Sequence, residues 1–160
     1  MGRSQAPMNK SFEIMMQHRK GLYRYLKEIP LDKLNAIPEG FRNNIVWNIG
    51  HTIVTQQLLM YQQAERVPVI AEDMISRYRR GTVPEGEATT EEVEHLKKLL
   101  FTTVEKTTED YQLGAFRSYK LYTTLNKVTL SNSEDALLFN NFHEGLHHGT
   151  ILALRKILSC

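Results

Sequence analysis

The sequence has very little cysteine, and this scarcity limits the kinds of site that it can form. Cys160 is the only cysteine among the 160 residues. With a single thiol, the chain can form no internal disulfide and no metal site built from several thiolates. The cysteine content therefore gives no indication of an oxidising compartment.

Long hydrophobic runs and an excess of charge of one sign are also missing. No apolar stretch approaches the roughly 20 residues that span a bilayer, and the Met1–Ala6 segment has neither a leader pattern nor a myristoylation signal. The formal net charge is +2, from 20 Lys and Arg and 18 Asp and Glu. A phosphate-binding surface usually needs a stronger positive field. We therefore expect a cytoplasmic protein with no membrane segment and no nucleic-acid partner.

What the sequence does contain is the composition of an ordinary globular chain. Hydrophobic residues make up 41% and charged residues 24%, both close to the usual shares. A chain of this length buries enough surface to fold as one unit. No repeat, linker or low-complexity tract divides it, so we expect a single domain over residues 1–160.

Helical periodicity runs through most of the sequence. It predicts helices over residues 10–29 and 41–66, which Pro30 and Pro68 end, and a short helix near 73–80. Two capping-box patterns, at residues 89–92 and 131–134, predict a third helix reaching about residue 113 and a fourth reaching about 158. These segments predict an all-α fold, a four-helix bundle with a long loop before the last helix.

That loop, residues 114–130, is long for a connection between helices and contains Phe116, Tyr119, Tyr122 and Leu125. Long ordered loops often act as lids over a site. The other interpretation is a loop that only covers one end of the bundle. The sequence leaves both open.

The chemistry centres on three histidines. His143 and His147 are four residues apart, so both imidazoles leave one face of the predicted helix, as two ligands of one metal ion require. His51 lies on a mainly apolar helix face, where an unpaired imidazole would be costly and metal coordination would offset that cost. We therefore predict a metal site formed by His51, His143 and His147. The other histidines (His18, His95 and His148) lack a partner at ligand spacing and are interpreted as ordinary core or surface residues.

Residues 143–147, His-Glu-Gly-Leu-His, also match the pattern of zinc proteases, in which the glutamate activates water. The pattern fixes only three of five residues, and the sequence lacks strands that would align a peptide. We therefore do not expect peptide hydrolysis. Glu144 remains a candidate base for another substrate.

The predicted last helix has a second apolar face, roughly opposite its histidines, so the sequence pattern predicts that this helix is buried on both sides. The face consists of Leu138, Phe142, Gly145, Leu146, Gly149 and Leu152. Each glycine costs a helix about 1 kcal/mol relative to alanine, so their four-residue spacing predicts the close approach of another helix. That helix can belong to the same chain or to a second subunit.

Residues 44–51 and 142–151 together carry a resemblance that spans nearly the whole chain. With Asn-Ile-Val-Trp-Asn-Ile-Gly-His and Phe-His-Glu-Gly-Leu-His-His-Gly-Thr-Ile in these two segments, the sequence resembles the DinB family of bacterial four-helix proteins, also called DinB/YfiT-like metalloenzymes. The family's three metal ligands fall on His51, His143 and His147. The resemblance implies a divalent metal ion, often zinc or nickel, and commonly a homodimer.

The resemblance leaves the reaction open. The wider superfamily is similar to thiol-dependent S-transferases and isomerases, which implies a small-molecule substrate and a low-molecular-weight thiol as partner. We expect a metal-dependent enzyme, either a thiol S-transferase or a hydrolase, with Trp47 and the aromatic loop placed to hold an apolar electrophile. The alternative is a non-catalytic metal-binding or dimeric interaction protein of the same fold.

Overall fold

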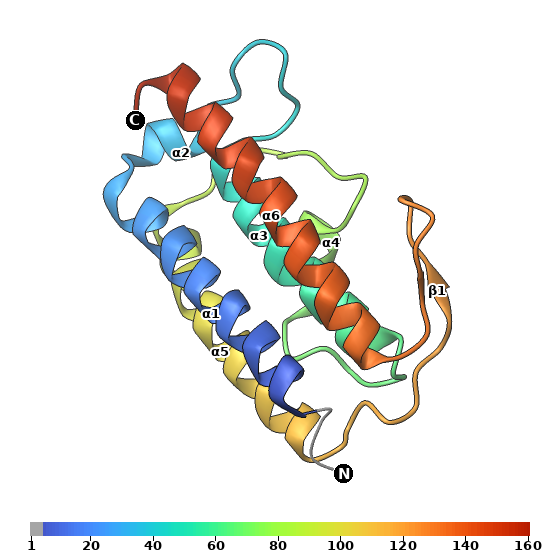
Figure 1. The fold of residues 1–160 in the computed structure, drawn as a ribbon. Coiled ribbons are helices and arrows are strands. Elements are labelled where there is room, and N and C mark those ends of the chain that lie inside the picture. Colours follow the sequence, from blue (N-terminus) through green and yellow to red (C-terminus); the bar gives the residue numbers. More distant parts are fainter. Residues whose placement is uncertain (1–4) are drawn as a thin grey trace.

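The chain folds as a bundle of four long helices. In the computed structural model, which describes residues 5–160, they are α1 (Gln5–Glu28), α3 (Ile45–Gln57), α5 (Thr90–Gln112) and α6 (Ser133–Leu158). Figure 1 shows α1 beside α5 and α6 beside α3, and contacts also join α1 to α6 and α3 to α5. Each long helix thus packs against two others, and the predicted all-α four-helix bundle is confirmed.

Shorter elements join the long helices. They are α2 (Leu31–Asn35), the π-helical turn η1 (Leu58–Gln62) that continues α3, and α4 (Glu72–Tyr78), which confirms the predicted short helix. The long loop before α6 contains a small antiparallel hairpin of β1 (Tyr122–Thr123) and β2 (Thr129–Leu130). Within residues 5–160, no helix combines the length and hydropathy needed to cross a bilayer. Residues 1–4 of the Met1–Ala6 segment lie outside the described residues.

The second long helix begins later than predicted. Asn44 has an extended backbone, and its side-chain oxygen accepts a hydrogen bond of 2.8 Å from the Trp47 N–H. This is the contact of an N-cap residue, which satisfies a backbone donor that the first helical turn leaves unpaired. The predicted start at Phe41 is therefore wrong, because the cap holds residue 44 outside the helix. The helical hydrogen bonds also end at Gln62 rather than at residue 66.

The first predicted cap is found, but only one half of the capping box forms. The Thr89 hydroxyl accepts a hydrogen bond of 3.2 Å from the Glu92 N–H, so α5 begins where predicted. The Glu92 carboxylate instead accepts a hydrogen bond from the Tyr78 hydroxyl and pairs with Arg77. It therefore ties α4 to the start of α5.

The cap of α6 lies one residue later than predicted. Asn132, not Ser131, accepts a hydrogen bond of 2.7 Å from the Asp135 N–H. The Asp135 carboxylate in turn accepts a bond of 2.9 Å from the Ser131 N–H. The cap is shifted by one position because asparagine accepts as well as serine does, and the returning carboxylate bond goes to the residue before the cap rather than to the cap itself.

Two apolar clusters fill the bundle, with buried polar side chains between them along the helices. One cluster gathers around Leu22, Ile49 and Leu96, and the other contains Met15, Leu59 and the loop residues Phe116 and Leu130. Between the stretches that belong to the two clusters, each long helix contributes buried polar residues, namely Arg19, Gln56, Gln57, Thr103, Asn140 and Glu144. The candidate site lies at the level of this polar layer.

The second apolar face of α6 is exposed in the chain itself, so the prediction that it is buried from both sides is wrong for one chain. Leu138, Phe142, Leu146 and Leu152 are 49–55% exposed. A Cβ atom built at Gly145 or Gly149 would have nothing within 4 Å. Since no helix within the described part of the chain approaches these glycines, a second subunit is the alternative that remains.

Gly50 is the glycine whose replacement tests the packing of α3 against α4. A Cβ at Gly50 would lie 2.5 Å from Tyr78 Cδ1, and the Tyr78 ring is buried and cannot move freely. We expect Gly50→Ala to lower the free energy of unfolding by about 1–3 kcal/mol through overpacking. Urea denaturation followed by circular dichroism measures the change.

Gly21 provides the matched control, because it lies inside α1 with nothing within 4 Å of its would-be Cβ. Gly21→Ala should raise the stability by up to about 1 kcal/mol through helix propensity alone. Equal effects of the two substitutions would contradict the close packing of Gly50 on Tyr78.

Candidate metal centre

Three histidines from two helices converge on one point. His51 comes from α3, and His143 and His147 come from successive turns of α6. One ring nitrogen of each lies within 4.8 Å of the other two, and the ring centroids are 4.6–5.1 Å apart. The structure therefore brings together the three residues selected from the sequence, in an arrangement that a single ion can bridge.

The hydrogen bonds of His51 and His147 fix which nitrogen faces the cluster. His51 Nδ1 lies 2.7 Å from the Tyr78 carbonyl oxygen, which can only accept, so Nδ1 carries the proton. His147 Nδ1 lies 2.8 Å from Asn48 Oδ1 and donates in the same way. In both rings Nε2 then holds a lone pair. This is the state in which imidazole binds a metal ion, with the other nitrogen held by a carbonyl oxygen.

Asn48 is oriented for this purpose by the start of its own helix. Its side-chain N–H donates a bond of 2.8 Å to the Asn44 carbonyl oxygen, which leaves Oδ1 pointing to His147. The sequence analysis missed Asn48. The available signal was an asparagine three residues before His51 in an otherwise apolar helical segment, on the side of the helix that carries the histidine.

Burial keeps the three imidazoles in the neutral form that metal binding needs. Desolvation lowers the pKa of His51, although the Tyr78 carbonyl acts in the opposite direction. Burial, followed by the neighbouring His51, lowers the pKa of His143 to about 4. Burial and the other two rings lower the pKa of His147 to about 3. The neutral rings therefore offer lone pairs near neutral pH.

A buried ring nitrogen of His143 also fits a metal ligand. His143 Nδ1 is inaccessible to solvent and has no hydrogen-bond partner among the residues whose side chains are described. An unpaired polar atom in such a place is costly. Coordination of an ion by this ring would help to offset that cost, and a donor set of three imidazoles suits a divalent transition-metal ion.

Glu144 lies next to His143 in the chain but is committed to a different contact. Its carboxylate is almost fully buried and pairs with Arg19 of α1 at 2.6 Å. It also bonds to His18 and Asn140. Burial acts to raise the pKa of Glu144, but the charge of Arg19 and the hydrogen bonds from His18 and Arg19 together outweigh it, so the pKa lies well below its usual range. Because its oxygens are occupied, Glu144 is a structural anion, and the idea that it acts as a base is not supported.

The remaining histidines have the ordinary roles expected for them. His18 contacts Glu144, as described above. His148 Nε2 lies 2.9 Å from the Tyr25 hydroxyl, so it joins α6 to α1 on the side away from the cluster. His95 is exposed on α5. None of the three belongs to the histidine cluster.

A cavity of about 420 Å³ opens onto the three histidines. Its walls come from α3 and η1 on one side and from the hairpin on the other. Trp47, Leu58, Leu59, Tyr122, Leu125 and Phe139 supply most of the surface. The size and the apolar lining are typical of a small-molecule site.

The loop before α6 both covers the bundle end and lines this cavity. Phe116 and Leu130 are buried in the second apolar cluster, and the Tyr119 hydroxyl donates to the Leu59 carbonyl oxygen at 2.9 Å. Tyr122 and Leu125 instead face the cavity. The loop therefore covers the end of the bundle with some residues, Tyr119 among them, and lines the cavity with others, whereas its action as a lid stays a prediction.

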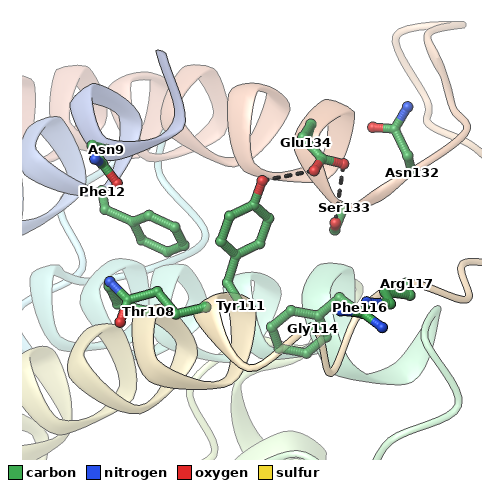
Figure 2. Close-up of a pocket in the computed structure, with 11 residues that line it drawn as sticks. Asn9, Phe12, Thr108, Tyr111, Gly114, Phe116, Arg117, Asn132, Ser133 and Glu134 are labelled. Atoms are coloured by element: carbon green, nitrogen blue, oxygen red, sulfur yellow. Dashed lines mark hydrogen bonds between the residues drawn. The ribbon is translucent and has the colours of Figure 1, made fainter. Parts of the chain in front are cut away.

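A second cavity, of about 550 Å³, lies where the end of α5 meets the start of α6, and it shares no lining residue with the first. Figure 2 shows the Tyr111 hydroxyl bonded to Glu134 and Ser133 bonded to the same carboxylate. Three of its polar side chains are joined by these two bonds, and no histidine lines it. These contacts join the helix ends, so we assign this cavity a structural origin.

The fold and the cluster together define a helical bundle with a three-histidine centre between two of its helices. The family model of the DinB superfamily matches residues 15–151, and the chain belongs to this superfamily. A conserved protein from Enterococcus faecalis has a similar crystal structure, with a TM-score of 0.64 at 14% identity, over 99% of this chain and 98% of that one. This likeness concerns the fold alone. No curated protein matches the sequence.

Removal of any one of the three imidazoles should sharply reduce metal binding. We expect the purified protein to hold about one divalent ion per chain and His51→Ala, His143→Ala and His147→Ala each to lose most of it, because two imidazoles hold an ion far more weakly than three. Elemental analysis of protein purified without added metal provides the measurement. His95→Ala is the control and should keep full occupancy. Full occupancy in all three variants would contradict the triad.

Proposed function

We propose that the chain is a metal-dependent enzyme that binds one divalent ion, zinc or nickel, at His51, His143 and His147 and acts on a small molecule. The main support for this proposal is that hydrogen bonds hold the Nδ1 protons of His51 and His147. The neutral Nε2 atoms of both rings are then free to bind an ion beside an apolar cavity. Three protein ligands are the number found in catalytic rather than structural zinc sites.

The chemistry proposed is the activation of a small thiol or of water. When bound, the ion supplies positive charge that lowers the pKa of the molecule in its open position. A thiol has a much lower pKa than water and ionises more readily in the same field. We therefore rank transfer to a low-molecular-weight thiol ahead of hydrolysis.

The residues around the histidines support a small apolar co-substrate. Trp47 stacks on His51 with a centroid distance of 4.6 Å, and it lines the cavity together with Tyr122. These rings exclude water and offer flat apolar surfaces to an electrophile. Peptide hydrolysis is disfavoured, since Glu144 is held by Arg19 and the strands present have only two residues each.

Two assay panels distinguish the reactions. We expect metal-loaded wild type to conjugate small electrophiles to bacillithiol, glutathione or cysteine, and His147→Ala to fall to the uncatalysed rate because it loses a ligand. Esters and amides without thiol form the second panel, and turnover there alone would favour a hydrolase. If the metal-loaded protein is inactive in both panels, a non-catalytic metal-binding or interaction protein becomes the better account.

We further propose that the chain forms a homodimer through the exposed apolar face of α6. This face presents Phe142 and Leu146 beside Gly145 and Gly149, where a Cβ would meet open space. A large exposed apolar patch on a soluble protein commonly marks an interaction surface. In a two-fold dimer the same face of a second copy covers it, and the glycines let the two helices approach closely.

Substitution within this face should separate the subunits. We expect wild type to show twice the mass of the chain in light scattering coupled to size exclusion, and Leu146→Glu to shift it to the monomer because a charge is then buried in the interface. Leu113→Glu is the control, because Leu113 is also an exposed leucine but lies at the C-terminal cap of α5, and it should leave the dimer intact. A wild-type monomer at high concentration would overturn the dimer.

A further inference from the structure

The cavity above the histidines has an unusual balance of charge. The ionisable residues that line it are the three histidines, Tyr122 and Arg80. No carboxylate lines it. Glu144 is buried elsewhere with Arg19. The cavity is therefore mostly apolar, with one guanidinium at its wall and no anion of its own to pair with it.

Arg80 is placed by a turn whose geometry is well defined. The Thr82 N–H donates to the Arg79 carbonyl oxygen at 3.2 Å, and Gly81 has a φ of +91°. A positive φ at the third residue is typical of a type II turn, in which glycine is favoured for this reason. Arg80 therefore occupies the second position, at the corner of the turn.

Both sides of this turn are bonded to residues of the candidate site. Before it, the Tyr78 carbonyl oxygen accepts the His51 Nδ1 proton. After it, the Thr82 hydroxyl accepts a bond of 3.0 Å from Trp47 Nε1. The backbone of Arg80 is thus held between two attachments to the floor of the cavity, which gives its side chain a defined place at the wall.

The charge of Arg80 has no ion-pair partner in the part of the chain that the structure describes. Arg77, the arginine at the end of α4, pairs with Glu92 at 2.9 Å. No ion pair of Arg80 occurs among residues 8–160, whose side chains the structure describes. A guanidinium offers a planar set of donors that matches a carboxylate. Its partner can therefore come from a molecule in the cavity.

We infer that the site takes a small, largely apolar substrate with a carboxylate group, and that Arg80 pairs with this carboxylate. The inference rests on the proposed function and adds the class of substrate. The apolar part of the molecule lies against Trp47 and the hairpin, and its carboxylate lies at the turn. Arg80 is then a specificity-determining residue for the charge of the substrate.

Trp47 allows a direct test, because it is the only tryptophan of the chain and lines the cavity. Its fluorescence can follow the binding of 3-phenylpropionate, 3-phenylpropanol and 3-phenylpropylamine, which share a framework and differ in the charge at one end. We expect the carboxylate to bind up to about fivefold more tightly than the alcohol, as an exposed ion pair allows, and the amine to bind most weakly. The preference should shrink at high salt because the charges are screened.

Variants at neighbouring arginines assign the effect to one side chain. Arg80→Gln should abolish the preference for the carboxylate while leaving the affinity for the alcohol unchanged, and Arg80→Lys should keep part of it. Arg79→Gln is the matched control, since Arg79 is exposed in the same turn but does not line the cavity. It should behave as wild type.

The same titrations in zinc-loaded and metal-free protein separate the guanidinium from the ion. Our inference requires that Arg80→Gln reduces the preference in both forms. It is overturned if no compound binds, if the three bind equally, if Arg79→Gln acts as Arg80→Gln does, or if the preference needs zinc and ignores Arg80. If the protein is inactive in the assays but still prefers the carboxylate, only the proposed enzymatic function is contradicted. If the enzyme is active but does not prefer the carboxylate, only the role of Arg80 is contradicted.

Discussion

The ion pair between Arg19 and Glu144 is the contact on which the arrangement of the site depends. Both side chains are essentially inaccessible to solvent, and the pair joins α1 to α6 at 2.6 Å. Loss of one partner from such a pair costs about 3–5 kcal/mol, because the other charge stays buried. The bundle must therefore form with Glu144 turned toward α1. His143 lies one residue before Glu144 and His147 three residues after it, so both point to a neighbouring face of α6. With Glu144 directed toward α1, that face is directed toward α3.

A second chain of contacts runs from a helix cap to the candidate metal centre. Asn44 caps α3 with its side chain, its carbonyl oxygen holds the Asn48 amide, and the Asn48 oxygen accepts the His147 proton. The residues that begin the helix thus also set the tautomer of a proposed ligand on another helix. Such hydrogen bonds commonly tune the affinity of a metal site as much as its position.

The cavity joins parts of the chain that have different structural roles. The long helices provide the histidines, whereas the turn at Arg80 and the hairpin around Leu125 provide walls. The helices are held by the apolar clusters and the buried ion pair. The loops are attached to them by hydrogen bonds of Tyr78, Thr82 and Tyr119 and by the packing of Phe116 and Leu130 in the second apolar cluster. Binding sites are often formed by loops on a rigid scaffold, and the same fold then accepts different substrates in different proteins.

The sequence by itself determined the features that arise within one helix. Periodicity and capping residues predicted the four long helices, and the four-residue spacing of His143 and His147 placed two imidazoles on one face. The apolar helix face around His51 indicated the third ligand, and the resemblance to the DinB family implied the same three residues. Tertiary structure decided what those faces meet: Glu144 is paired with Arg19, Asn48 orients His147, and Arg80 reaches the cavity across 29 positions from His51. These contacts depend on the rotation and register of packed helices. Local periodicity does not encode them, because it identifies the apolar face of a helix but not the residues that pack against that face.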